Sequence, residues 1–156
     1  MTEPATFVVR AEPLTGAVFA PFGQVVAEGD MVMELRGDEM FHLNVLHYDR
    51  QPLRCDHLNR HHRATQMLVA LAGKPTLLVV APSELDFTTT AHLDGIRAFV
   101  CDGTAGVNLA LGTWHWGPYP VADYVDLVNV QGKDFAHDNE VAHLERDLHT
   151  IVEVVL

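Results

Sequence analysis

Short apolar runs, each ended by Gly, Pro or Asp, follow one another along most of this chain. They span residues 31–37, 41–49, 65–73, 75–83, 96–103, 106–112 and 122–132. Runs of this length between turn-forming residues are typical of β-strands. No predicted helix between them is long enough to connect two parallel strands. The pattern therefore predicts an all-β fold with an antiparallel sheet closed into a sandwich or a small barrel.

Two short helices are predicted at the ends of this strand series. The segment Leu14–Gly23 begins with Thr15 as a possible N-cap, has apolar residues at helical spacing and ends at a glycine. The segment Glu140–Leu148 also has apolar residues at helical spacing, and we expect a last strand over Ile151–Leu156.

Composition limits the classes of partner. The 156 residues show no repeat or linker, and 48% of them are hydrophobic, so a single domain over 1–156 is expected. Lys+Arg 10 minus Asp+Glu 21 gives a net charge of -11, which disfavours nucleic acid and anionic membranes. The start shows no export signal, and the two cysteines, Cys55 and Cys101, are interpreted as small core residues. We expect a soluble, cytoplasmic protein.

Histidine is the side chain most able to carry chemistry here, and the chain has ten. His61 and His62 are adjacent, so in an extended segment they point to opposite faces and only one enters a barrel. We choose His61. Gln66, five positions later, can face the same way if the chain bends between Arg63 and Thr65.

A second candidate lies between two tryptophans. Strand alternation puts His115 on one face, and Trp114 and Trp116 on the other. If the indoles pack outside the barrel, the imidazole faces the cavity. The structural alternative is that His115 is a hydrogen-bonded core residue, and the sequence favours neither.

The spacing in these two segments resembles the two-part signature of the cupin barrels. The series Asn59-x-His61-x4-Gln66-x6-Gly73 keeps the spacing of the first part, and Gly112-x-x-His115 keeps that of the second. Asn and Gln stand where that signature has a His and a Glu. The resemblance implies a cupin-like, jelly-roll antiparallel β-barrel with a short N-terminal and a short C-terminal helix.

Nearly the whole chain is similar to the ureidoglycolate lyase family, of which it looks like a divergent member. The segments that carry the resemblance are Pro13–Gly23, Leu58–Gln66, Leu77–Pro82, Arg97–Phe99, Gly106–Asn108 and Gly112–His115, with Asp126 in the last core strand. The resemblance implies a C–N lyase of allantoin and purine catabolism that splits ureidoglycolate, or a related ureido or amide acid, into glyoxylate and urea. Such an elimination needs a base, an acid and an anchor for the carboxylate.

The resemblance also implies roles for individual residues. His61 and His115 share the acid and base roles, Gln66 orients the substrate, and Asp126 fixes a histidine tautomer or accepts a substrate N–H. The substrate-binding residues that it implies are Arg60, Arg97, Asn108 and Trp114.

This chain departs from the family pattern where polar or charged residues are expected. Leu109–Leu111 replaces a polar triplet, Trp116 a second histidine, Gln131 and Gly132 an aspartate and an arginine, and Val45 an arginine. Positive charge for a carboxylate is thereby lost. Either the substrate differs, or other residues compensate, for which the candidates are Arg50, Arg54, Arg60 and Arg97. A solvated surface position is the simpler interpretation of Arg50 and Arg54.

Two other function classes remain open at this point. One is a metal-dependent cupin oxygenase or isomerase with a divalent metal at His61, Gln66 and His115, although the lyase reaction requires no cofactor. The other is a non-catalytic cupin that binds a small molecule, which the apolar triplet 109–111 favours. A small-molecule partner is expected in each case, and the cupin resemblance implies a homodimer.

Overall fold

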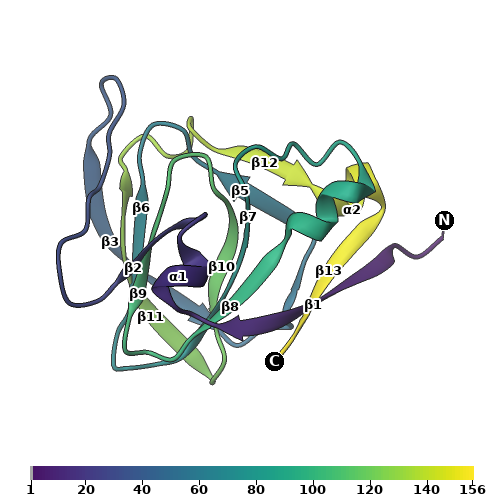
Figure 1. Ribbon diagram of the computed structural model, residues 1–156, viewed down its shortest axis with the longest axis horizontal. Coiled ribbons are helices and arrows are strands. Elements are labelled where there is room, and N and C mark those ends of the chain that lie inside the picture. Colours follow the sequence, from purple (N-terminus) through teal and green to yellow (C-terminus); the bar gives the residue numbers. More distant parts are fainter. Residues whose placement is uncertain (1) are drawn as a thin grey trace.

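The computed structural model describes residues 2–156 and contains two curled sheets that face each other in a half-barrel (Figure 1). One sheet has five strands in the order β2-β9-β6-β11-β3, and the other has eight in the order β12-β5-β10-β7-β8-β1-β13-β4. The strands are β1 (Ala5–Pro13), β2 (Gly23–Val26), β3 (Phe41–Asp49), β4 (Arg54–Cys55), β5 (His57–Arg60), β6 (Gln66–Ala70), β7 (Thr76–Ala81), β8 (Arg97–Cys101), β9 (Gly106–Leu109), β10 (Trp114–Pro120), β11 (Tyr124–Gly132), β12 (Glu140–His143) and β13 (Thr150–Val155). The helices are α1 (Gly16–Phe19), the 3-10 helix η1 (Thr90–Gly95) and α2 (Leu144–Leu148). The all-β, cupin-like fold expected from the sequence is confirmed.

Six of the seven runs predicted as strands contain strands, but the first does not. Residues 31–37 form only an isolated bridge, in which Leu35 pairs with Ala64. Val32 and Leu35 are exposed, so this segment has no apolar face to bury against a sheet. The prediction of a strand over 31–37 is therefore wrong.

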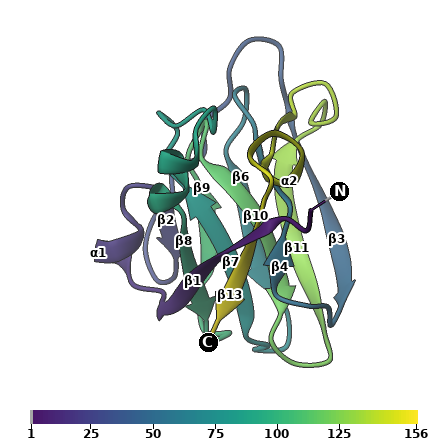
Figure 2. The same cartoon turned by 90° about the vertical axis from the view of Figure 1, so that its right-hand side faces the viewer.

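The sheet is not purely antiparallel, which corrects a second expectation. Strand β1 runs parallel to β13 over Ala5–Arg10 and parallel to β8 over Ala11–Pro13. Figure 2 shows β1 and β13 side by side, although they lie at opposite ends of the chain. Sequence patterns report local structure, and a pairing between the two ends has no local signal.

The two predicted helices are present but shorter than expected. In α1, the Thr15 side chain accepts a hydrogen bond from the Val18 backbone N–H, as an N-cap does. At the other end, Glu140–His143 pairs with β5 as β12, so the helix predicted over 140–148 begins only at Leu144. Among residues 2–156 the structure contains no helix with the length and hydropathy needed to cross a membrane.

The interior between the two sheets is apolar at one end. Helix α1 lies at this end (Figure 1), where the buried side chains are Phe19, Phe22, Leu68, Leu78, Val80, Phe99, Cys101, Val107 and Leu109. A second cluster covers the opposite face of the eight-stranded sheet and includes Leu77, Val79 and Trp114. Strand β7 therefore buries both of its faces, which explains its continuous apolar run.

Candidate active site

A hollow of about 520 Å³ opens between the two sheets, and polar but uncharged side chains line most of it. His61, Gln66 and His115 all face it, as the sequence analysis predicted. The other lining residues are Asn44, Leu46, Tyr48, Asn59, Trp116, Gly117, Tyr119, Gln131, Phe135, Ala136 and Asn139. Both imidazoles therefore face the same hollow, and polar side chains leave space there for a small molecule.

Backbone pairing explains why the two imidazoles meet. Asn59 of β5 lies directly opposite His115 of β10, and the His61 carbonyl accepts a hydrogen bond from the Gly112 N–H at 2.8 Å. The centroids of the His61 and His115 rings are 5.3 Å apart. Strand β5 ends at Arg60 and β6 begins at Gln66, so the extended conformation is interrupted between the two strands. This is the bend that lets His61 and Gln66 face the same way.

Alternation along β10 separates His115 from its neighbours. The side chains of Trp114 and Trp116 belong to the cluster on the other face of the sheet, while the imidazole points into the interior. Trp116 also borders the hollow, at its edge. His115 is 7% exposed, so its functional nitrogen is reached only through the hollow.

Backbone carbonyls fix the same tautomer in both histidines. The Nδ1 of His61 lies 3.2 Å from the Asp138 carbonyl oxygen, and the Nδ1 of His115 lies 3.1 Å from that of Thr113. Because a carbonyl only accepts, each Nδ1 carries the proton and donates it. Each neutral ring therefore keeps Nε2 free of hydrogen and able to take a proton.

Burial keeps both imidazoles neutral near pH 7. Burial, together with the nearby His61, lowers the pKa of His115 to about 4. Burial also lowers the pKa of His61, but the Asp138 carbonyl, the Asp138 charge and the Gln66 side chain oppose this effect. His61 therefore has three groups that favour its protonated form, whereas His115 has only the Thr113 carbonyl.

Amides and tyrosines complete the polar wall; sequence reasoning named Gln131 only as a departure from the family pattern and did not identify the others. Asn44, Asn129 and Gln131 point inward from β3 and β11, and Tyr48 and Tyr119 contact each other with ring centroids 5.0 Å apart. Burial raises the pKa of Tyr119 to about 12, so its hydroxyl remains a donor. The available signal was the pair of amides Asn129 and Gln131, which share a face of the run 122–132 with the apolar Val125 and Leu127.

The structure does not bring Asp126 or Asn108 to the hollow, which corrects two expected positions. Both side chains project outward from the outer face of the five-stranded sheet. Asp126 accepts a hydrogen bond from His47 Nδ1 at 2.7 Å, and Asn108 Nδ2 donates to Gln24 and to the Val32 carbonyl. Neighbouring residues on each strand face inward, so alternation directs these two outward.

The expected substrate-binding residues on the eight-stranded sheet are also away from the hollow. The Arg60 guanidinium lies 4.1 Å from the centroid of the Trp114 ring, on the outer side, and pairs with Glu140 at 2.8 and 2.9 Å. Arg97 pairs with Glu12 at 2.7 and 2.8 Å. Each guanidinium forms an ion pair with a glutamate outside the hollow, so neither arginine supplies the hollow with the positive charge that is lost from the family pattern.

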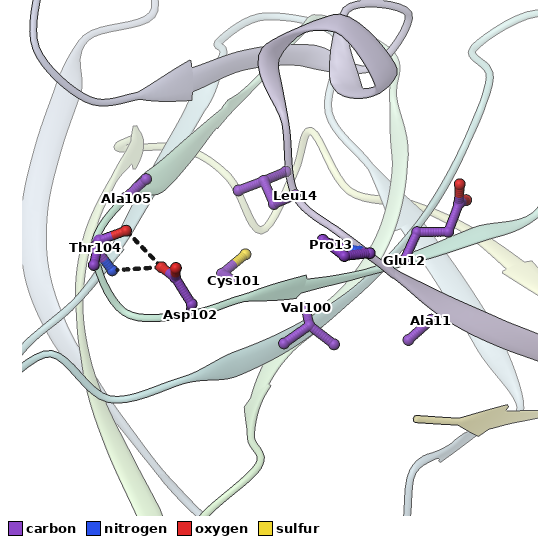
Figure 3. Close-up of a pocket in the computed structure, with 9 residues that line it drawn as sticks. All are labelled: Ala11, Glu12, Pro13, Leu14, Val100, Cys101, Asp102, Thr104 and Ala105. Carbon is purple, nitrogen blue, oxygen red and sulfur yellow. Dashed lines mark hydrogen bonds between the residues drawn. The ribbon is translucent and has the colours of Figure 1, made fainter.

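A separate cavity of about 460 Å³ lies between the end of β1 and the turn that follows β8 (Figure 3). Its two carboxylates already have partners, since Asp102 accepts hydrogen bonds from Thr104 and Glu12 binds Arg97. Its remaining wall is mainly apolar, with Leu14 and Val100 shown in Figure 3. This cavity lacks the acid–base groups of the histidine hollow.

The hollow does not fit a tightly held divalent metal. Its strongest donors are the two imidazoles, and Gln66 adds a neutral amide oxygen. Among the described residues, no group of three or more His, Cys, Asp or Glu is placed to hold a metal ion. Without a carboxylate or thiolate, nothing in the wall balances the charge of the ion.

A cupin-like β-barrel with two neutral imidazoles in an uncharged hollow is a small-molecule site suited to proton transfer. The family model for ureidoglycolate lyase matches residues 36–151. The chain belongs to the ureidoglycolate lyase family.

Curated relatives agree with this assignment. A ureidoglycolate lyase of Pseudomonas fluorescens (strain Pf0-1) is 36% identical over 124 residues, which cover 67% of this chain and 72% of the relative. The ureidoglycolate lyase of Burkholderia mallei (strain NCTC 10229) is 32% identical over 151 residues, covering 83% and 85%. That of Azotobacter vinelandii (strain DJ / ATCC BAA-1303) is 31% identical over 139 residues, covering 76% and 80%.

Proposed function

We propose that this protein is a lyase that cleaves the C–N bond of ureidoglycolate, or of a related ureido or amide acid, into glyoxylate and urea. The observation that carries the proposal is the pair of histidines whose unprotonated Nε2 atoms share one hollow. Family membership supplies the substrate class. The reaction would serve allantoin and purine breakdown.

The elimination needs one proton removed and one delivered. In the proposed mechanism, His115 Nε2 takes the proton of the carbinol hydroxyl as the C=O bond of glyoxylate forms. The C–N bond breaks, and His61, in its protonated form, gives a proton to the departing nitrogen, which yields urea. The proton then passes between the neighbouring rings, so that no net charge or electron is transferred.

Gln66 and the tyrosines would hold the substrate for this step. The Gln66 amide donates to Asn129 and lies beside His61, and the Tyr48 and Tyr119 side chains line the same hollow. Their uncharged donors and acceptors suit a ureido group. No cofactor takes part in this mechanism.

Alanine variants of the two histidines test the proposal. General acid or base catalysis typically contributes ~10²- to 10⁴-fold, so His61→Ala and His115→Ala should each lose about that much turnover of ureidoglycolate. His47→Ala is the matched control, because His47 is an exposed histidine on the outer face of the five-stranded sheet. Full turnover by His115→Ala would refute the assignment, and binding without turnover by the wild type would indicate a binding protein.

We further propose that the protein works in the cytoplasm as a homodimer, formed along β3. This strand is the edge of the five-stranded sheet, and its outward side chains Leu43 and Val45 are 64% and 55% exposed. Unpaired strand edges with apolar neighbours favour pairing with a second copy. Light scattering should give twice the chain mass, and Val45→Glu should halve it; a monomeric wild type would contradict the proposal.

A further inference from the structure

Three amide side chains form a continuous hydrogen-bonded series along the wall of the hollow. Gln66 Nε2 donates to Asn129 Oδ1 at 2.9 Å, and Asn129 Nδ2 donates to Asn44 Oδ1 at 2.8 Å. The three residues come from the neighbouring strands β6, β11 and β3, and Asn129 lies directly opposite Asn44 in the ladder. Asn129 is 0% exposed, so hydrogen bonds to solvent cannot replace these two bonds.

The series fixes which end of the Gln66 amide is free. Both bonds run in one direction, so Gln66 uses its NH₂ group on Asn129 and keeps its carbonyl oxygen for the hollow. That oxygen, Oε1, is buried and, while His61 is neutral, has no hydrogen-bond partner among residues 2–156. It faces His61, whose protonated form it supports. Buried acceptors are normally paired, so an unpaired one beside a cavity indicates a partner that the ligand supplies.

We infer that Asn129 and Asn44 are positioning residues that hold the Gln66 carbonyl oxygen toward the imidazoles, so that the hollow selects ligands with a free N–H donor. This inference rests on the proposed function, in which the ligand carries a ureido group. The terminal NH₂ of such a group matches the Gln66 oxygen, whereas a fully N-alkylated group leaves that oxygen without a partner. Asn129 does not touch the reacting atoms and acts through Gln66.

Binding of an unreactive ligand pair tests the inference without requiring turnover. N-Carbamoylglycine has the ureido group and the carboxylate but no carbinol hydroxyl, so it cannot eliminate. Its N′,N′-dimethyl derivative lacks the terminal N–H donors. Because one hydrogen bond is worth about a factor of ten in affinity, the wild type should bind the first ligand about tenfold more tightly by isothermal titration calorimetry.

Three variants separate the role of Asn129 from a general effect on the fold. Asn129→Leu releases Gln66, so the tenfold ratio should fall to about one. Asn129→Asp still accepts from Gln66 Nε2, so the ratio should survive even if both affinities change. Val128→Ala is the matched control, because Val128 is the next residue on β11 and faces outward, and it should keep both affinities and the ratio.

The possible outcomes are distinct. An unchanged ratio in Asn129→Leu, or a ratio inverted by Asn129→Asp, would overturn the inference, because Gln66 would then present its NH₂ group or be held by other contacts. If Asn129→Leu does not fold, Asn44→Leu removes the other end of the series, and the ratio should again fall. A wild type that shows the ratio but cannot cleave ureidoglycolate would refute the proposed function alone.

Discussion

Binding of a carboxylate in the hollow should be accompanied by uptake of a proton. Among the residues that line it, none is Lys, Arg, Asp or Glu, and only His61 and His115 can become cationic near neutral pH. Asp138, next to His61, favours the protonated form of that ring. An anionic ligand must therefore bind to a neutral site or bring a proton to the histidine pair.

The size of the effect follows from the separation of charges. A carboxylate about 4 Å from an imidazolium gains about 4 kcal/mol at an effective dielectric constant of about 20. Since 1.36 kcal/mol corresponds to one pKa unit, this raises a pKa by about 3. Applied to the histidine pair through His115, whose pKa burial lowers to about 4, the same increase gives the pair a pKa of about 7 in the complex, and the Asp138 charge favours placing this proton on His61. Because the rings are neighbours, the proton belongs to the pair.

Burial lowers the pKa in the free protein and the ligand raises it in the complex, so affinity falls as pH rises toward the pKa of the complex. About 0.9 protons should be taken up per glyoxylate at pH 6 and about 0.1 at pH 8, and affinity should be about tenfold higher at pH 6. Calorimetry in buffers of different ionisation enthalpy measures the uptake. Urea, which is neutral, is the control ligand and should take up none.

Uptake that is absent at pH 6, or affinity for glyoxylate that is equal at pH 6 and pH 8, would refute this reasoning. The double variant His61→Ala/His115→Ala provides the second check. It removes both acceptors of the proton, so any uptake that it still shows would place the proton elsewhere.

Three further predictions concern residues outside the catalytic pair and the question of a metal. Asp126→Asn should change turnover by no more than about twofold, because Asp126 lies on the outer face of the five-stranded sheet. A larger loss of turnover in steady-state assays would show that Asp126 contributes to catalysis. Arg60→Ala should lower the free energy of unfolding by about 1–2 kcal/mol, through loss of the Trp114 contact and of a pair with the half-exposed Glu140, with KM unchanged. Denaturant titration and kinetics measure this, and a raised KM with normal stability would contradict it. Dialysis against a chelator should leave activity intact, and activity restored only by an added divalent metal would overturn the metal-free mechanism.

The sequence by itself determined most of the strands and the side of its strand on which His115 lies. The runs over 41–49 and 75–83 contain β3 and β7 because their apolar spacing and the turn residues that bound them act locally. Alternation around Trp114 and Trp116 separates His115 from both indoles. The odd spacing of His61 and Gln66 showed only that a bend is needed if both are to face inward, and the structure supplied that bend.

Only the tertiary structure decided which face of each strand is concave. Alternation assigns Asp126 and Asn129 to opposite faces of β11 but does not say which of them the sheet encloses. The direction in which the two sheets curl depends on contacts between distant strands, such as the parallel pairing of β1 with β13. For that physical reason the expected roles of Arg60, Asn108 and Asp126 lost their geometric support, while the amide series through Asn129 became visible only in three dimensions.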